Sequence, residues 1–141
     1  MKRIAAVILG LMICFGEARA ERPPQARDKA KLVVAATVKK ITSKESSFGG
    51  DGTRTAYTAE VVVDSVESGD GVKVKPGEKL TVAWFHVTKK PSGPFVGAYG
   101  HGYDIKEKDR AKFWLMPGGQ GVAKGAWAVI YNKNGVEKIK K

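Results

Sequence analysis

The chain has 141 residues, of which 25 are Lys or Arg and 14 are Asp or Glu, so its formal net charge is +11. This length accommodates one domain with a targeting segment and excludes two ordinary domains. A hydrophobic fraction of 43% supports a packed core and argues against a wholly disordered chain. A single cysteine excludes a disulfide framework and a cysteine-based zinc finger.

The first twenty residues have the tripartite pattern of a secretory signal peptide. Lys2 and Arg3 form a basic start, residues 4–15 form an apolar run, and Ala18 and Ala20 stand in the A-x-A arrangement that precedes a cleavage site. The run is shorter than the roughly 18–20 apolar residues that span a bilayer. We therefore predict cleavage after Ala20, export to the periplasm or the cell exterior, and no remaining transmembrane anchor. A retained membrane anchor is the alternative.

Cleavage at this point would also remove the cysteine. Cys14 lies inside the apolar run, and we interpret it as a hydrophobic residue of the signal rather than as a lipid attachment site. The remaining 121 residues have a net charge of +9 and no cysteine, so they must rely on packing. A domain of this size buries about two-thirds of its unfolded surface, which is sufficient for a stable core.

The first half of the remaining chain is predicted to contain two strands. Residues 21–31 are polar and proline-containing, and we expect a flexible lead-in there. Residues 32–41 are rich in β-branched side chains and predict a strand, whereas residues 42–53 carry clustered turn-forming residues and predict a loop. From Tyr57 onward, apolar and polar residues alternate with a period of two, and a shift of the apolar face predicts a bulge or bend near Asp64.

Three more strands are predicted in the second half, at residues 80–87, 111–116 and 126–132. Segments that contain glycine and proline separate them. Residues 133–141 are predicted to form a basic tail. Five strands with almost no helix are typical of a small barrel or sandwich, so we predict one all-β domain over residues 32–132.

The connection at residues 88–110 favours one of these two architectures. It is rich in glycine, proline and aromatic residues, and Asp104 with Glu107 three positions later resembles a helix-capping pair. Oligonucleotide/oligosaccharide-binding (OB) barrels have five strands, and they usually insert a helix between strands 3 and 4. We therefore predict a five-stranded antiparallel OB-like barrel with one short helix at that place. An Ig-like β-sandwich is the alternative, although it needs about seven strands.

Four segments add a family resemblance to this prediction. In the order LVVAATVKKI, YTAEVVVDSV, KPGEKLTVAWF and DRAKFWL, they resemble exported bacterial OB-like domains related in architecture to the netrin-type and tissue-inhibitor-of-metalloproteinases module. Residues 74–80 resemble the segment that introduces the third strand of such domains, and residues 110–115 resemble their fourth strand. The resemblance covers residues 32–131 and implies an OB-like barrel.

The chain departs from the animal modules at their defining cysteines. The inhibitors place an N-terminal cysteine on the metal of their target, whereas this chain, after cleavage, would begin at Glu21 and contain no cysteine. Inhibition of a metalloproteinase by that route is therefore not expected. The resemblance carries over no functional residue.

The sequence holds no recognised catalytic or metal-binding motif. The nucleophile elbow G-x-S-x-G is absent, and the glycine-rich strings lack the strand-to-helix context and the Lys-Ser/Thr ending of phosphate loops. The two histidines, His86 and His101, lie fifteen residues apart, and even with Asp104 they would form a sparse metal site. We therefore predict a protein that is not an enzyme and that uses no metal or cofactor.

The same long connection carries the candidate ligand-binding residues. Aromatic side chains beside lysines suit stacking on sugars or bases together with neutralisation of phosphate or sulfate. The candidates are Phe95, Tyr99, His101 and Tyr103, flanked by Lys89, Lys90, Lys106 and Lys108. The alternative is that Phe95 or Tyr99 folds back and plugs the end of the barrel.

Two classes of function remain. We expect a protein-interaction or assembly module, whose partner in the envelope or outside the cell is recognised through a salt-tolerant contact on an apolar patch. The alternative is a binder of an anionic polysaccharide or another polyanion, whose affinity would fall steeply with salt. Nucleic acid is the weaker form of this alternative, because an exported protein seldom meets it.

Overall fold

The computed structural model describes residues 22–69, 71–95, 97–119 and 122–141. The predicted signal peptide, with Ala18 and Ala20, lies outside these ranges, so its cleavage and the export of the chain stay predictions. Within the described ranges, no helix has the length and apolar character needed to cross a membrane.

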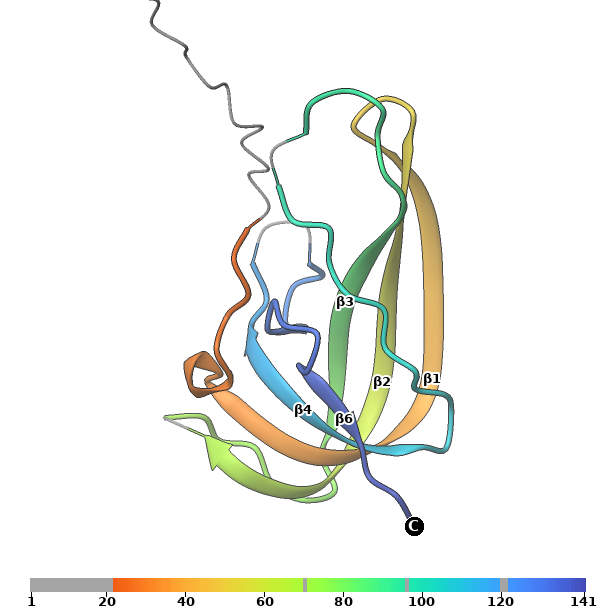
Figure 1. The fold of residues 1–141 in the computed structure, drawn as a ribbon. Coiled ribbons are helices and arrows are strands. Elements are labelled where there is room, and N and C mark those ends of the chain that lie inside the picture. Colours follow the sequence, from red (N-terminus) through yellow and green to blue (C-terminus); the bar gives the residue numbers. More distant parts are fainter. Residues whose placement is uncertain (1–21, 70, 96, 120–121) are drawn as a thin grey trace, which may run out of the picture.

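The described part of the chain is all-β, as predicted, apart from one short 3-10 helix, η1 (Arg27–Lys29). Its strands are β1 (Leu32–Phe48), β2 (Gly52–Gly69), β3 (Lys79–Lys89), β4 (Arg110–Pro117), β5 (Trp127–Val129) and β6 (Val136–Lys138). They form one sheet in the order β1-β2-β3-β5-β4-β6 (Figure 1). A further pairing of β1 with β4 joins β1, β2, β3, β5 and β4 into a ring.

The sheet is mixed, which corrects the prediction of a wholly antiparallel set of strands. β3 and β5 are parallel and pair over only two positions, Val82 with Trp127 and Ala83 with Ala128, whereas the other strand pairs are antiparallel. β5 and β6 follow one another along the same edge of β4, and residues 130–135 form an excursion between them. The ring therefore closes through a very short parallel contact.

The core lies inside this ring. Side chains alternate between the two faces of a strand, so every second residue of β1 and β2 points inward. The buried interior residues are Leu32, Val34, Ala36, Val38, Ala59, Val61, Val63, Val82, Trp84, Ile105, Ala111, Phe113 and Leu115. A smaller cluster of Val33, Trp114 and Ile130 is buried separately from this interior. The alternation seen in the sequence thus becomes a division between inside and outside.

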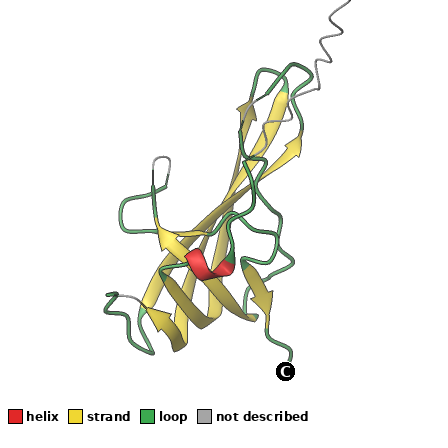
Figure 2. Cartoon of the chain, turned by 60° about the vertical axis from the view of Figure 1, so that its left-hand side comes forward, coloured by secondary structure: helices red, strands yellow, loops and turns green. Residues whose placement is uncertain are grey.

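The first two strands are longer than predicted. They span 17 and 18 residues, and the predicted loop at residues 42–53 is wrong over residues 42–48, which continue β1, and over residues 52 and 53, which begin β2. Only Gly49, Gly50 and Asp51 form the turn. The polar residues of β1 pair there with a segment of β2 that contains Thr and Tyr. These residue types favour extended structure, so the pairing with β2 decides the local conformation. Together with the end of β3, these residues (42–56 and 85–89) form what we call the arm, which projects beyond the ring (Figure 2).

The predicted irregularity near Asp64 is confirmed. Ala35 pairs with Ser65 and Ala36 with Val63, so Asp64 is an extra residue in β2. Its carboxylate accepts hydrogen bonds from Thr37 Oγ1 at 3.0 Å and from Arg110 Nε at 3.0 Å. A bulge bends its strand and increases the local twist. This bend lies within the part of β1, from Leu32 to Thr37, that pairs with β4 on its other edge.

The predicted short helix between β3 and β4 is wrong for the described residues of this connection. Residues 99–101 instead run along the edge of β3, where Val87 N donates to Tyr99 O at 2.7 Å and His101 N donates to Phe85 O at 3.0 Å. β5 pairs with β3 only as far as Ala83, so the extended segment satisfies backbone groups that would otherwise lack partners. A single helical turn offers no such compensation.

The predicted capping pair also has other contacts. The Glu107 carboxylate accepts a hydrogen bond from Ile41 N at 3.2 Å, on the neighbouring strand. The turn before β4 is closed by Asp109, whose carboxylate accepts from Lys106 N at 2.9 Å and whose pKa is lowered by a hydrogen bond from Lys138 and by the Lys106 N–H. These contacts hold the end of the connection against β1 and β6.

The segment before β1, predicted as a flexible lead-in, packs along the outside of the ring. Gln25 N donates to Tyr131 O at 2.6 Å, Tyr131 N donates to Gln25 Oε1 at 2.9 Å, and Asn132 Nδ2 donates to Gln25 O at 2.7 Å. The Arg27 guanidinium lies 3.6 Å from the centre of the Trp114 ring. Two ends of the described chain are thereby fastened to each other.

The edge pairing of residues 99–101 depends on a glycine. Gly100 has a φ of +69°, and a Cβ at this position would overlap the carbonyl oxygen of Phe85. We expect Gly100→Ala to lower the free energy of unfolding by about 1–3 kcal/mol, measured by urea denaturation. Gly93→Ala is the control, because a Cβ there meets no atom within 4 Å. Equal losses in the two variants would contradict this account.

Candidate functional site

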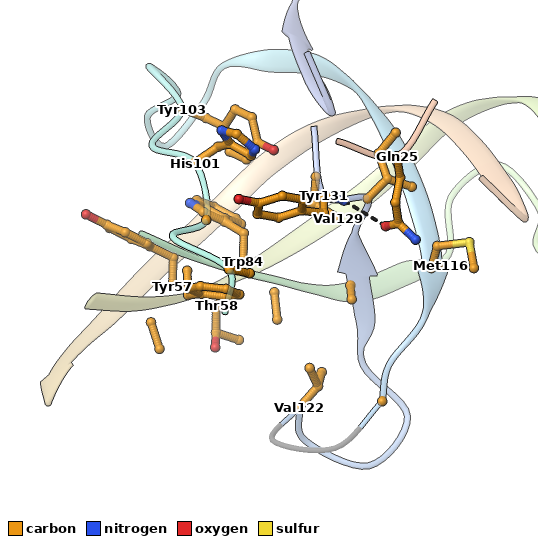
Figure 3. A pocket seen from close by; sticks show the side chains of 18 of the residues that line it. Gln25, Tyr57, Thr58, Trp84, His101, Tyr103, Met116, Val122, Val129 and Tyr131 are labelled. Atoms are coloured by element: carbon orange, nitrogen blue, oxygen red, sulfur yellow. Dashed lines mark hydrogen bonds between the residues drawn. The ribbon is translucent and has the colours of Figure 1, made fainter. Parts of the chain in front are cut away.

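A cavity of about 510 Å³ lies beside β3, where the pairing of the ring stops (Figure 3). Its lining comes from β2, β3, β5 and the end of β4, from the connection at residues 98–103, and from the segment before β1. β3 contacts β5 over only two residues, so no continuous sheet closes the space between these elements. Side chains line this space instead. We call this space the β3 cavity.

One side of the β3 cavity is a row of mostly small residues. Thr58 pairs with Ala83, Ala83 with Ala128, and Ala128 with Met116, so the row crosses four strands in register. Directly paired residues share one face of a sheet, and all four of these line the cavity. Their small size leaves a depression in the sheet surface.

Aromatic side chains form another side. Tyr57 and Trp84 are stacked, with ring centres 5.3 Å apart and an angle of 10° between the planes. Tyr103 meets Trp84 edge-on at 6.0 Å, and His101 lies 4.8 Å from the ring of Tyr131. Figure 3 shows Tyr57, Trp84, His101 and Tyr103 on the same side of the cavity, with the Tyr131 ring directed toward them. The cavity therefore offers both ring faces and polar edges.

Tyr103 fixes this aromatic side in place. Its hydroxyl donates to the carbonyl oxygen of Asn132 at 2.6 Å, and its burial raises the pKa of the phenol well above its usual value. The side chain also packs against the core cluster inside the ring. Tyr103 is thus a structural residue that links the long connection to the excursion between β5 and β6.

The charge of the lining is positive. Arg22 and Arg54 line the β3 cavity, and its described lining residues include no Asp, Glu or Lys. The Arg54 guanidinium carbon lies 5.7 Å from the Phe48 ring centre and 5.5 Å from that of Phe85. The Arg22 guanidinium carbon lies 5.9 Å from the ring centre of Tyr131. A cavity with aromatic sides and two arginines favours a ligand that combines an apolar group with a negative charge.

The predicted ligand-binding residues do not gather at one place. Phe95 and Tyr99 pack together at 5.6 Å at the end of the arm, where Phe95 also meets Phe48 at 4.4 Å. The Lys90 ammonium lies 4.8 Å from the centre of the Tyr99 ring. Neither Phe95 nor Tyr99 belongs to the core cluster inside the ring, so neither plugs it. These residues form a separate cluster on the arm.

The other predicted residues lie elsewhere. His101 and Tyr103 line the β3 cavity, whereas Lys89 ends β3 opposite Thr53. Lys106 and Lys108 belong to the turn before β4, where Lys108 N donates to Val38 O at 2.8 Å. The connection therefore distributes the eight candidates over the arm, the cavity and the far end of the ring.

The sequence analysis missed several residues that line the cavity. Arg54, Ala56 and Thr58 alternate with the inward-facing residues of β2, and this alternation would have placed them together on the outer face. The low bulk of Ala56 and Thr58 was the available signal. The contribution of Arg22 and Gln25 could not be found in this way, because it depends on where the segment before β1 packs.

Comparison with known proteins gives no relative. No known protein family, no curated protein and no solved structure matches this chain. The resemblance to exported bacterial OB-like domains therefore stays a prediction. Over the described ranges, no group of three or more His, Cys, Asp and Glu residues is arranged to hold a metal ion.

The contacts of Tyr103 predict a pH-dependent effect. Tyr103→Phe removes the hydrogen bond to Asn132 O, and we expect it to lower the free energy of unfolding by about 1 kcal/mol at neutral pH. Because the pKa of the folded phenol is raised, only the unfolded wild type ionises as the pH passes the ordinary value of 10.0, and stability is lost there. The variant lacks this loss.

Urea denaturation of both proteins at neutral pH and at about pH 11 measures the difference. The stability gap between wild type and Tyr103→Phe should shrink at the higher pH. A gap that stays constant would contradict the raised pKa.

Proposed function

We propose that this protein is an exported, non-enzymatic binding module of the OB-barrel type, and that it acts in protein interaction or assembly by holding a segment of a partner protein in the β3 cavity. OB barrels are five-stranded and partly open, and they bind ligands on the face of strands 2 and 3 and on the loops that connect strands 1 to 2 and 4 to 5. The ring of β1, β2, β3, β5 and β4 and the position of the cavity support this assignment.

The composition of the cavity carries the proposal. Binding sites for small groups occupy about 300–1,000 Å³, and they combine apolar walls with a few polar groups. The β3 cavity has about 510 Å³, a row of small residues on one side and aromatic rings on another. Such a space accommodates more than one side chain of a peptide segment.

The polyanion alternative has less support. The lysines predicted to flank the aromatic residues are divided between the arm and the turn before β4, so they form no single basic surface. Four other basic residues form ion pairs with acids within the described chain. These ion pairs are Arg27–Glu137, Arg110–Asp64, Lys112–Glu67 and Lys138–Asp109.

Filling the cavity tests this proposal. Ala56 lies on β2 directly opposite Phe85, is exposed and lines the cavity, so Ala56→Trp places a large ring in the space that the ligand needs. Peptides selected from a random display library on the purified full-length chain should bind Ala56→Trp at least about tenfold more weakly, measured by calorimetry. Ser68→Trp, exposed on the same strand and outside the cavity, is the control.

Salt dependence separates the two functions in the same preparation. Peptide binding that weakens only modestly between low and physiological salt supports the interaction module. The polyanion alternative would replace it under a different result. In that case no peptide is selected, a sulfated glycan binds with an affinity that falls steeply with salt, and Ala56→Trp leaves that affinity unchanged.

A further inference from the structure

Three described arginines lie within about 6 Å of an aromatic ring centre, and two of them, Arg27 and Arg54, differ in their hydrogen bonds. Arg27 covers Trp114 and donates through Nε and Nη2 to the carbonyl oxygen of Asn134, at 3.0 and 2.9 Å. It also donates to Glu137 Oε2 at 2.9 Å. The charge and the donors of Arg27 are therefore satisfied within the chain.

Arg54 has the rings but not the acceptors. Its guanidinium carbon lies within about 6 Å of the ring centres of Phe48 and Phe85, and its Nε is buried with no hydrogen-bond partner among the described residues. The ion pairs of the described chain do not include it. A buried donor on a charged group without an acceptor is costly, and native proteins keep few of them. Arg54 therefore requires an explanation that the fold alone does not supply.

The surroundings of Arg54 indicate what would satisfy it. Arg54 lines the β3 cavity on the same strand and face as Ala56, and Ala56 is paired with Phe85. The planar guanidinium fork matches a carboxylate in a bidentate arrangement, and the two nearby rings restrict the orientation of the fork. A carboxylate bound there would lie beside the apolar surface of Phe85 and the row of small residues.

We propose that Arg54 is the anion-binding residue of the β3 cavity, and that the segment recognised there carries a carboxylate next to an aromatic or aliphatic group. This inference rests on the proposed function, because it assigns the chemistry of the ligand in that same site. The carboxylate belongs either to an acidic side chain or to the C-terminus of a partner. Both sources present the same group to the guanidinium.

A matched pair of small probes tests the carboxylate. Phenylpropionate and phenylpropanamide have the same ring and nearly the same shape, and only the first carries a negative charge. We expect the full-length chain to bind phenylpropionate about tenfold more tightly, the difference that a charge-assisted hydrogen bond supplies. Nuclear magnetic resonance titration follows both probes, and the Arg54 Nε–H signal should shift with phenylpropionate only.

Variants then assign this preference to one residue. Arg54→Gln should remove the tenfold difference, and Arg54→Lys should keep only part of it, because lysine retains the charge without the fork. Arg110→Gln removes one positive charge outside the cavity and should keep the full difference. Urea denaturation of each variant establishes that it is folded. If Arg54→Gln does not fold, Arg54→Lys still tests the proposal.

The outcomes separate this inference from the function on which it rests. If the library peptides bind and respond to Ala56→Trp but neither they nor the probes respond to Arg54→Gln or Arg54→Lys, the function stands and this inference is wrong. Failure of wild type to prefer phenylpropionate also overturns it. If Arg54→Gln instead abolishes binding of a sulfated glycan while phenylpropionate does not bind, the anion is a polyanion rather than a peptide carboxylate.

A final comparison identifies the source of the carboxylate. Selected peptides are synthesised with a free and with an amidated C-terminus, and with Gln in place of each Glu. Loss of affinity on amidation assigns the C-terminal group, and loss on the Glu→Gln exchange assigns a side chain. Full affinity in both sets of peptides would contradict the proposal that a carboxylate is recognised.

Discussion

Backbone groups on the edge of β3 beyond Ala83 have no strand of the ring to pair with, because β5 is too short to reach them. Residues 99–101 take this position, and the need to satisfy those groups keeps the long connection extended. The same placement brings His101 and Tyr103 beside Trp84 and Tyr131. The incomplete pairing along β3, the extended connection and the aromatic side of the cavity are thus consequences of one short strand, β5.

The cavity combines two surfaces with different origins. Its small residues follow from strand register, because Thr58, Ala83 and Ala128 are directly paired across three strands. Two of its aromatic residues, Tyr57 and Trp84, are also directly paired on β2 and β3, whereas Tyr103 and Tyr131 come from segments outside regular structure. Regular structure therefore supplies the small residues, two of the rings and Arg54, and the segments outside it supply the other rings and Arg22. This division is common in proteins that bind ligands on a β scaffold.

The sequence was a good guide wherever one strand face is buried. The alternation from Tyr57 onward predicted β2, and the displaced apolar face near Asp64 predicted its bulge, because both reflect the boundary between core and solvent. Asp104 and Glu107 were misleading, because they indicate a helix from local sequence alone. The connection instead pairs with the free edge of β3, which exists only in the assembled sheet. Arg54 was missed because a lone arginine in a polar stretch is usually solvated, and the sequence does not show that the side chains of Phe48 and Phe85 lie close to it.

The hydrogen bonds of Gln25 connect residues 106 and 107 positions apart, and those of Arg27 reach 110 positions along the chain. The contacts that position Arg22 and Gln25 at the cavity therefore join the first described residues to residues more than a hundred positions later. A chain emerging from the ribosome can pair β1 with β2 early, but it has no complete cavity until Tyr131 has been synthesised. The complete cavity consequently forms late, and a product that ends before Tyr131 lacks it even where its β1 and β2 are paired.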